Sequence, residues 1–218
     1  MLDFNLFDIL TTAAGLIVAG SGIAAISVWK KQIRLDRNIK FIDELTDTLN
    51  EYVQSMGIII DAYQYIFIGI RVYAKYSKDN NICDEKEKLY YGFTKYVKTR
   101  GQKERDQLNR YLFETKPIVS KLCSLSTKGQ IYGFKNYTKC RFVLDRFIWI
   151  YNVSSSFSFN LGNTNAVWKN PEVKKLIMDL LDKDYEYLKN KLKNLHIEYL
   201  EYAREVYSDL FSNKYKNY

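Results

Sequence analysis

The longest uninterrupted run of apolar positions lies close to the N-terminus. From Ile9 to Trp29 the sequence ILTTAAGLIVAGSGIAAISVW contains no charged residue, and about twenty apolar helical residues match the hydrocarbon thickness of a bilayer. The preceding MLDFNLFD includes Asp3 and Asp8 but no lysine or arginine, whereas a cleaved signal peptide normally starts with basic residues. We therefore interpret residues 9–29 as a transmembrane helix, in preference to a signal peptide or a buried core helix.

Basic residues follow this segment at once, and they are Lys30, Lys31, Arg34 and Arg37. Positive charge gathers on the cytoplasmic flank of a membrane span. The pattern predicts a single-pass protein of the inner (cytoplasmic) membrane, with its N-terminus outside. Residues 1–29 would form a short leader and the transmembrane helix, and residues 30–218 a helical domain in the cytosol.

Small residues line one side of the predicted transmembrane helix. Spacings of three, four and three residues place four of them on one face: Thr12, Gly15, Ala19 and Gly22. Small residues let two helix backbones approach closely in lipid, so the stripe predicts a homo-oligomer interface. Glycine and alanine are also common in membrane helices that have no partner, which is the alternative.

Helical spacing continues beyond the basic residues. No proline or glycine occurs between Trp29 and Gly57, and apolar residues recur at helical intervals as far as Met56. We expect the membrane helix to continue into the cytosol as a stalk. The apolar stretch from Gly57 to Ile70 could be read as a second span, but Asp61 and Gln64 favour a core helix, because burying them in lipid is costly.

Polar stretches, glycine and proline in the remaining sequence predict where the later helices begin and end. The polar stretch Ser77 to Glu87 predicts a loop in which Asp84 caps a following helix. We expect Gly101 to interrupt that helix and Pro117 to kink or break the next one.

The last third of the chain contains two further apolar patterns. Phe134 to Asn152 predicts a helix, and the serine-rich VSSSFSFNLGNTN after it predicts a loop. Pro171 is expected to open a long final helix with one apolar stripe as far as Leu210.

Composition supports an all-α fold class. The 218 residues include ten glycines and two prolines, and such a shortage of turn-forming residues favours long helices. We predict a single transmembrane helix that continues into an antiparallel bundle of four to five helices. The cysteines Cys83, Cys123 and Cys140 are widely spaced, so we expect buried thiols and no disulfide framework or zinc site.

The chain contains one histidine, His196, which restricts the catalytic options. A site with several histidine ligands for zinc cannot be built within one chain, and neither the nucleophile motif G-x-S-x-G nor a phosphate-binding glycine loop occurs. Helical geometry places His196 at the edge of the apolar stripe, where a structural role is common. We predict no metal, no cofactor and a protein that is not an enzyme.

Charge suggests which partners the chain could bind. All 33 basic residues follow the apolar segment and 23 of the 25 acidic residues do so, which gives the cytosolic part a net charge of about +10 and favours anionic partners. These could be anionic membrane lipid or, with many tyrosines present, RNA. A spread of charge that merely keeps the protein soluble is the third possibility.

The sequence KNKLKNLH resembles the motif of the helical HEPN ribonucleases, in which four to six residues lie between an arginine and a histidine. Lys191 occupies the arginine position before His196, and lysine lacks the planar fork with which arginine binds phosphate. The resemblance therefore implies a degenerate HEPN-like domain. Weak catalytic candidates are His196 with Lys191 or Arg204.

The layout of the whole chain also resembles a known family. A short acidic leader, a small-residue-rich span, the junction VWKKQIRLDR and a tyrosine- and lysine-rich helical part look like small bacterial membrane proteins, and in particular the membrane accessory protein of type VI-B CRISPR systems. That resemblance implies a pore-forming or membrane-perturbing oligomer in antiviral defence. A membrane-tethered adaptor for a protein encoded nearby, and an RNA-binding or RNA-cleaving HEPN-like domain, are the alternatives.

Overall fold

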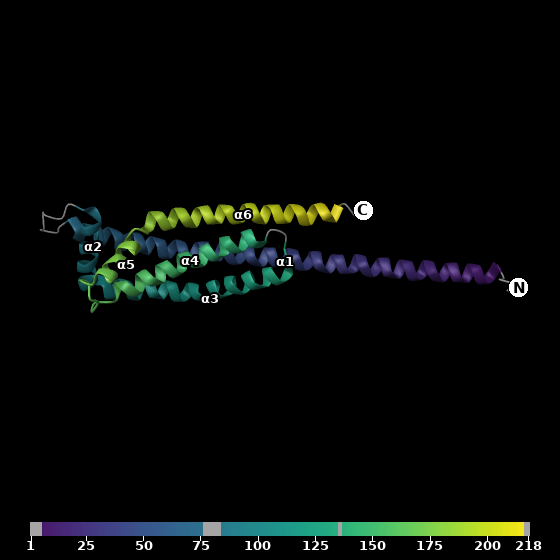
Figure 1. Ribbon diagram of the computed structural model, residues 1–218, viewed down its shortest axis with the longest axis horizontal. Coiled ribbons are helices and arrows are strands. Elements are labelled where there is room, and N and C mark those ends of the chain that lie inside the picture. The colour runs from purple at the N-terminus through teal and green to yellow at the C-terminus, as the bar shows by residue number, and fades with distance from the viewer. Residues whose placement is uncertain (1–5, 76–83, 135–136, 216–218) are drawn as a thin grey trace.

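The computed structural model describes residues 6–75, 84–134 and 137–215, with side chains for all of these except 6–20, 23–24 and 213–215. Helix α1 (Leu6–Lys75) is one unbroken helix of 70 residues, about 105 Å long at 1.5 Å per residue. It passes without interruption through residues 29 and 30, so the expected continuation of the N-terminal helix into a stalk is confirmed. Its N-terminal part projects far beyond the other helices (Figure 1).

Four long helices form the body of the protein: α1, α3 (Gln102–Tyr132), α4 (Tyr137–Leu161) and α6 (Tyr185–Tyr215). Helices α3 and α6 each pack against both α1 and α4, and successive long helices reverse direction (Figure 1). Neighbouring helices are therefore antiparallel, and the described residues contain no strand. The predicted all-α antiparallel bundle is confirmed at this level.

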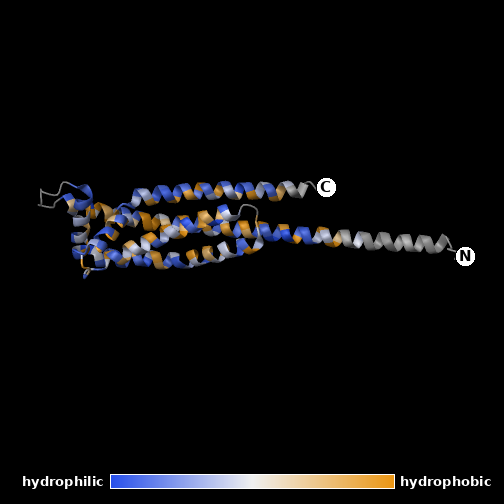
Figure 2. Cartoon of the chain, viewed as in Figure 1, coloured by the Kyte–Doolittle hydropathy of each residue, from blue (hydrophilic) through white to orange (hydrophobic). Residues whose placement is uncertain are grey.

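The core begins at Phe41 and extends to the far end of α1. Large aromatic side chains from α1 and α4 meet in its middle: Tyr63 and Phe157 have ring centroids 4.2 Å apart, and the Tyr52 hydroxyl donates to the Phe147 carbonyl at 2.5 Å. Hydrophobic and hydrophilic positions alternate along the helices of the bundle (Figure 2). Each helix thus contributes one apolar face to a shared core, which supplies most of the stability of a bundle.

Residues 57–70 of α1 lie within this bundle. One apolar face of this segment is buried at helical spacing, and it consists of Ile59, Ile60, Tyr63, Ile66, Phe67 and Ile70. Asp61 faces solvent on the opposite side. The expectation of a core helix at this position is confirmed.

Two short helices close the end of the bundle that lies away from the N-terminus (Figure 1). They are α2 (Glu85–Tyr96) and α5 (Pro171–Leu181), and a π-helical turn, Val97–Gly101, joins α2 to α3. Ion pairs tie the two short helices together, with Lys174 Nζ 2.5 Å from Glu87 Oε1 and Lys86 Nζ 2.6 Å from Asp182 Oδ2. Asp84 caps α2 as predicted, because its side chain accepts from the amide of Lys86 at 3.0 Å.

The predicted interruption at Gly101 is present, because the π-helical turn Val97–Gly101 separates α2 from α3. Other predicted boundaries prove wrong, since α3 continues through Pro117 without a break. The serine-rich segment is helical as far as Leu161, because Val153, Phe157 and Leu161 bury one face of it in the core. Tertiary packing thus overrides the weak helix propensity of serine.

Pro171 does open a helix, but it is the short α5 and not the long final one. Helix α6 starts after a break at residues 182–184, where the Asp184 side chain accepts from the amide of Tyr187 at 3.0 Å. An aspartate in this position is a common helix start. The apolar stripe therefore runs across two helices that the pattern alone merged into one.

Candidate functional site

The N-terminal part of α1 presents an exposed apolar surface. From Ser21 to Arg34 every residue with a described side chain is exposed, including Ile26, Val28, Trp29 and Ile33. An apolar helix of this kind needs either lipid or another protein around it, because a water-exposed apolar patch of this size is unusual in a soluble monomer.

The described stretch Ala25–Lys75 of α1 is long and apolar enough to cross a membrane, by length and composition. Within this stretch, one face of residues 57–70 is buried in the bundle core. In Figure 1 the backbone of the charge-free segment Ile9 to Trp29 extends beyond the other helices, so this segment is the better candidate for lipid contact.

The predicted small-residue face lies in this projecting part of α1. Gly22 is exposed, and a Cβ atom built on it would meet no other atom within 4 Å. Another helix could therefore approach Gly22 closely. The side chains of Thr12, Gly15 and Ala19 lie outside the described residues.

The basic residues after Trp29 form an exposed collar where α1 enters the bundle. Lys30, Lys31, Arg34 and Arg37 are all exposed. The Arg37 guanidinium lies over the ring of Tyr132, with Cζ 4.5 Å from the ring centroid. A cation–π contact of this kind holds the C-terminal end of α3 beside the collar.

His196 lies half-buried on α6 and faces α1. Its Nε2 atom is 3.1 Å from Oδ1 of Asn50, so the imidazole joins the two helices. The predicted position at the edge of the apolar stripe is confirmed. Asn50 was not singled out by the sequence, since its position opposite His196 depends on how α1 and α6 pack.

Lys191 points to a different neighbour. Its Nζ atom is 5.3 Å from the ring centroid of Trp149 on α4 and 5.7 Å from that of Tyr187. Five residues separate Lys191 from His196, which corresponds to about 140° around a helix. The structure therefore does not bring this pair to one point, as a shared phosphate-binding site within one chain would require.

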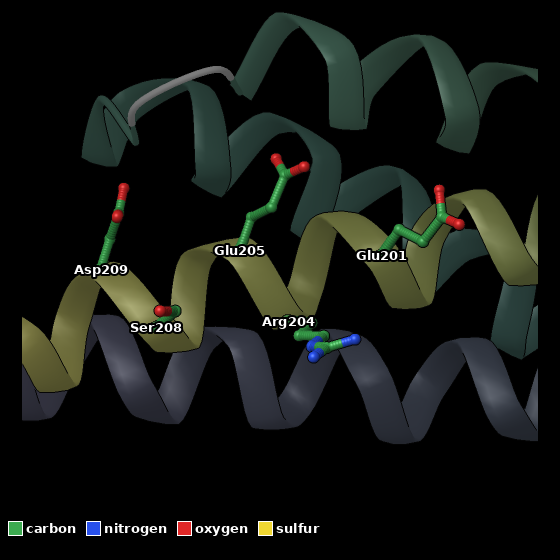
Figure 3. A pocket seen from close by; sticks show the side chains of 5 residues that line it. All are labelled: Glu201, Arg204, Glu205, Ser208 and Asp209. Atoms are coloured by element: carbon green, nitrogen blue, oxygen red, sulfur yellow. The ribbon is translucent and has the colours of Figure 1, made fainter.

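Arg204 lies further along α6, eight residues or about 12 Å from His196. It lines a shallow surface groove together with Glu201, Glu205, Ser208 and Asp209, and Figure 3 shows its guanidinium directed to the opposite side from the Glu205 and Asp209 carboxylates. All five side chains come from one helix, so the groove is a flank of α6 and has no second wall of its own. The three acidic residues give this flank a negative charge.

Within the described residues, the other polar side chains are not grouped in an arrangement suited to catalysis. No group of three or more potential ligands with metal-binding geometry occurs there. Burial raises the pKa of the Cys140 thiol to about 12, so this thiol stays protonated and unreactive at neutral pH. The expectation of buried thiols holds for Cys140 and is wrong for Cys123, which is exposed; Cys83 lies outside the described residues.

The comparisons with known proteins do not place the chain in a family. No family model, no curated protein and no solved structure matches it. The fold and the exposed surfaces therefore carry the functional argument.

Proposed function

We propose that this chain is a non-enzymatic, oligomerising membrane protein. The helix from Ile9 to Trp29 spans the inner membrane with the N-terminus outside, and the bundle lies in the cytosol. One observation carries the proposal: the N-terminal part of α1, exposed and apolar, extends well clear of a bundle whose core begins only at Phe41.

Charge at the junction supports the orientation. Lys30, Lys31, Arg34 and Arg37 are exposed on the bundle side of the apolar segment, and the leader before it contains two aspartates and no basic residue. Membrane proteins usually keep a cluster of basic residues beside a span on the cytoplasmic side.

Assembly is proposed to occur through the face formed by Thr12, Gly15, Ala19 and Gly22. The open space around Gly22 supports this, because a neighbouring helix can reach the backbone there without displacing any part of the bundle. Close contact between small-residue faces is a common way for membrane helices to associate when there is no hydrophobic effect between them.

The different directions of Lys191 and His196 support a role that does not involve cleavage. Each side chain is held by a neighbouring helix, Lys191 by α4 and His196 by α1. If the protein nevertheless cleaved RNA and lost that activity in a His196→Ala variant, the non-enzymatic assignment would fail.

The resemblance of layout extends the proposal to an accessory role in bacterial antiviral defence of the CRISPR type. Such a role predicts that deleting the gene in its native host lowers protection against phage. Protection that is unchanged by the deletion would contradict this part of the proposal and leave the membrane assignment standing.

Two measurements test the central proposal. Membranes containing the full chain are first washed with alkaline carbonate, which a spanning helix resists. The protein is then purified in detergent, and its mass is measured by light scattering for the unchanged chain and for Gly15→Ile/Gly22→Ile.

The matched control is Gly20→Ile, which lies about 160° around the helix from Gly22. We expect the double variant to lower the number of subunits and the control to leave it unchanged. Equal masses for all three proteins would remove the small-residue interface, and loss of the chain in the carbonate wash would remove the span.

A further inference from the structure

Helix α1 leaves an apolar stripe uncovered within the bundle. Helices α2, α3 and α6 pack against other sides of α1, and its outer side presents large apolar side chains that are 47% to 75% exposed: Ile58, Tyr65, Ile68 and Val72. We call these four residues the α1 stripe. A contiguous apolar run on the outside of a bundle helix is a common mark of a contact with another molecule.

Lipid cannot cover this stripe. Ile58 lies 29 residues after Trp29, which is about 44 Å along the helix from the end of the apolar segment. The polar headgroup layer extends only roughly 5–7 Å beyond the hydrocarbon. With the segment from Ile9 to Trp29 in the membrane, the α1 stripe therefore lies far outside it, and a protein is the occupant to consider.

The α1 stripe and the small-residue face lie on the same side of the helix. Gly22 and Ile58 are 36 residues apart, which is ten complete turns at 3.6 residues per turn. Tyr65 and Val72 follow at intervals of seven residues, about 20° and 40° from that direction. Ile68 lies at the edge of the stripe, about 80° away. Because α1 is unbroken, this relation holds along one continuous helix.

Membrane insertion fixes the height and direction of each copy of the chain. Copies with the same topology are parallel, so every residue of one copy is level with the same residue of its neighbour. Two copies that meet at Gly22 therefore present their α1 stripes to each other at equal height. Long helices curve gently, which allows both contacts in one pair even where the axes cross by about 20°, as is common in membranes.

We propose that the α1 stripe is a second self-contact, at which parallel copies of this chain pack α1 against α1 beyond the membrane. This inference rests on the proposed small-residue interface and deepens it. Assembly then involves one side of α1 from the membrane as far as Val72, about 75 Å from Gly22.

Carboxylates on the same side limit how closely the copies approach. Asp47 and Glu51 are exposed within about 20° of the direction of Gly22, and Asp61 is exposed about 60° away, inside the stripe. In a parallel pair each of them faces its own counterpart, and like charges repel across an interface. The copies therefore touch at the small-residue face and at the α1 stripe, and Asp61 weakens the second contact.

Disulfide cross-linking of single cysteines in membranes tests both contacts. The full chain carries Cys83→Ser and Cys123→Ser and keeps Cys140, which is buried. It then receives one cysteine at a time, at Gly22→Cys, Tyr65→Cys or Phe113→Cys. Mild oxidation links cysteines whose Cα atoms come within about 7 Å of each other.

Phe113→Cys is the matched control for Tyr65→Cys. Phe113 on α3 is 76% exposed, against 75% for Tyr65. It lies 19 residues before Tyr132, which packs against Phe41, so in the antiparallel bundle it is about level with residue 60 of α1. Random collisions therefore link the two positions to a similar extent, and only a contact through the α1 stripe favours position 65.

We expect a product of twice the chain mass from Gly22→Cys and from Tyr65→Cys, several times more abundant than from Phe113→Cys. Asp61→Asn, added to Tyr65→Cys, should raise the linked fraction about twofold, because it removes one pair of facing charges. Asp179→Asn on α5 removes the same charge away from the stripe and should leave the linked fraction unchanged.

Cross-linking at position 22 with no excess at position 65 over position 113 would overturn this inference and leave the proposed function standing. A position-65 product with any mass other than twice that of the chain would assign the stripe to a different protein and overturn it as well. An unchanged or lower linked fraction with Asp61→Asn would contradict copies that face each other. No product at position 22 would contradict the small-residue interface of the proposed function, and the shared side with it.

Discussion

At the scale of single residues, the structure explains glycines that the sequence shows only as residues of low helix propensity. Gly129 lies in α3, and a Cβ atom there would be 2.2 Å from the Tyr137 ring. The glycine therefore lets α3 and α4 approach where the hairpin closes. Sequence alone could not distinguish it from Gly57, which has nothing within 4 Å of its Cβ position.

Replacing these two glycines by alanine should have opposite effects. Gly129→Ala forces the buried Tyr137 ring to move and should lower the free energy of unfolding by about 1–3 kcal/mol. Gly57→Ala, in an open helical position, should raise it by about 0.5–1 kcal/mol, because alanine restricts the unfolded chain. Thermal unfolding followed by circular dichroism in detergent measures both, and a stabilising Gly129→Ala would contradict the packing described.

Tyr137 should also give the bundle a dependence on alkaline pH. Its hydroxyl donates to the Ser126 carbonyl at 2.6 Å, and burial raises its pKa to about 12 from 10.0. A tyrosine with a raised pKa stabilises the folded state fully below pH 10, and that contribution is lost as the pH rises toward 12.

We expect Tyr137→Phe to cost about 1 kcal/mol at neutral pH, because it leaves the Ser126 carbonyl with one donor fewer. Its urea unfolding free energy should then fall less steeply than that of the unchanged protein between pH 10 and 12. Parallel pH profiles would show that this hydroxyl does not titrate in that range.

At the scale of helices, the hydrophobic pattern predicted which segments are helical better than where they end. The stripe from Leu181 to Leu210 contains no sign of a break in its apolar spacing, yet the chain starts a new helix at Tyr185. The signal that could have found it is Asp182-Lys-Asp184, a cap sequence. The serine-rich end of α4 could not be predicted in this way, since buried neighbours and a Ser158 bond to Asn109 of 2.7 Å decide it.

Asp184 should therefore contribute more to the free energy of unfolding than an ordinary surface carboxylate does. It caps α6 and also lies 3.1 Å from Arg71 Nη2 on α1. Asp184→Ala should lower the unfolding free energy by about 1–2 kcal/mol, mostly through the lost cap. Asp179→Ala is the control, because Lys183 bonds its backbone carbonyl, which the substitution keeps; equal losses in both variants would exclude a capping role.

At the scale of the whole molecule, the sequence predicted the helical class, the continuous N-terminal helix and the exposed basic collar. It did not predict how the charged runs of the later helices are arranged around α1. Both runs of charge are present in the sequence, from Lys116 to Leu144 and at Glu201, Glu205 and Asp209. Which side each run occupies depends on the packing of α3, α4 and α6 around α1, which local spacing cannot supply.

Two surfaces of α1 could hold subunits together. Replacing the membrane helix distinguishes between these two candidate interfaces. Besides the small-residue face, the bundle part of α1 leaves Ile58, Tyr65, Ile68 and Val72 exposed at spacings of seven, three and four, a spacing typical of helix pairs. If residues 6–29 are exchanged for an unrelated, monomeric membrane helix of equal length, assembly through the anchor predicts a single chain by light scattering.

An unchanged subunit number in this chimera would instead assign assembly to the bundle. Tyr65→Lys/Ile68→Lys should then dissociate the chimera, because lysines facing each other across such a contact repel and resist burial. The same pair of lysines in the native chain should leave the mass unchanged if the anchor alone holds the subunits. A chimera that is monomeric but still functions in its host would mean that assembly is dispensable and would favour a tethered adaptor over a pore.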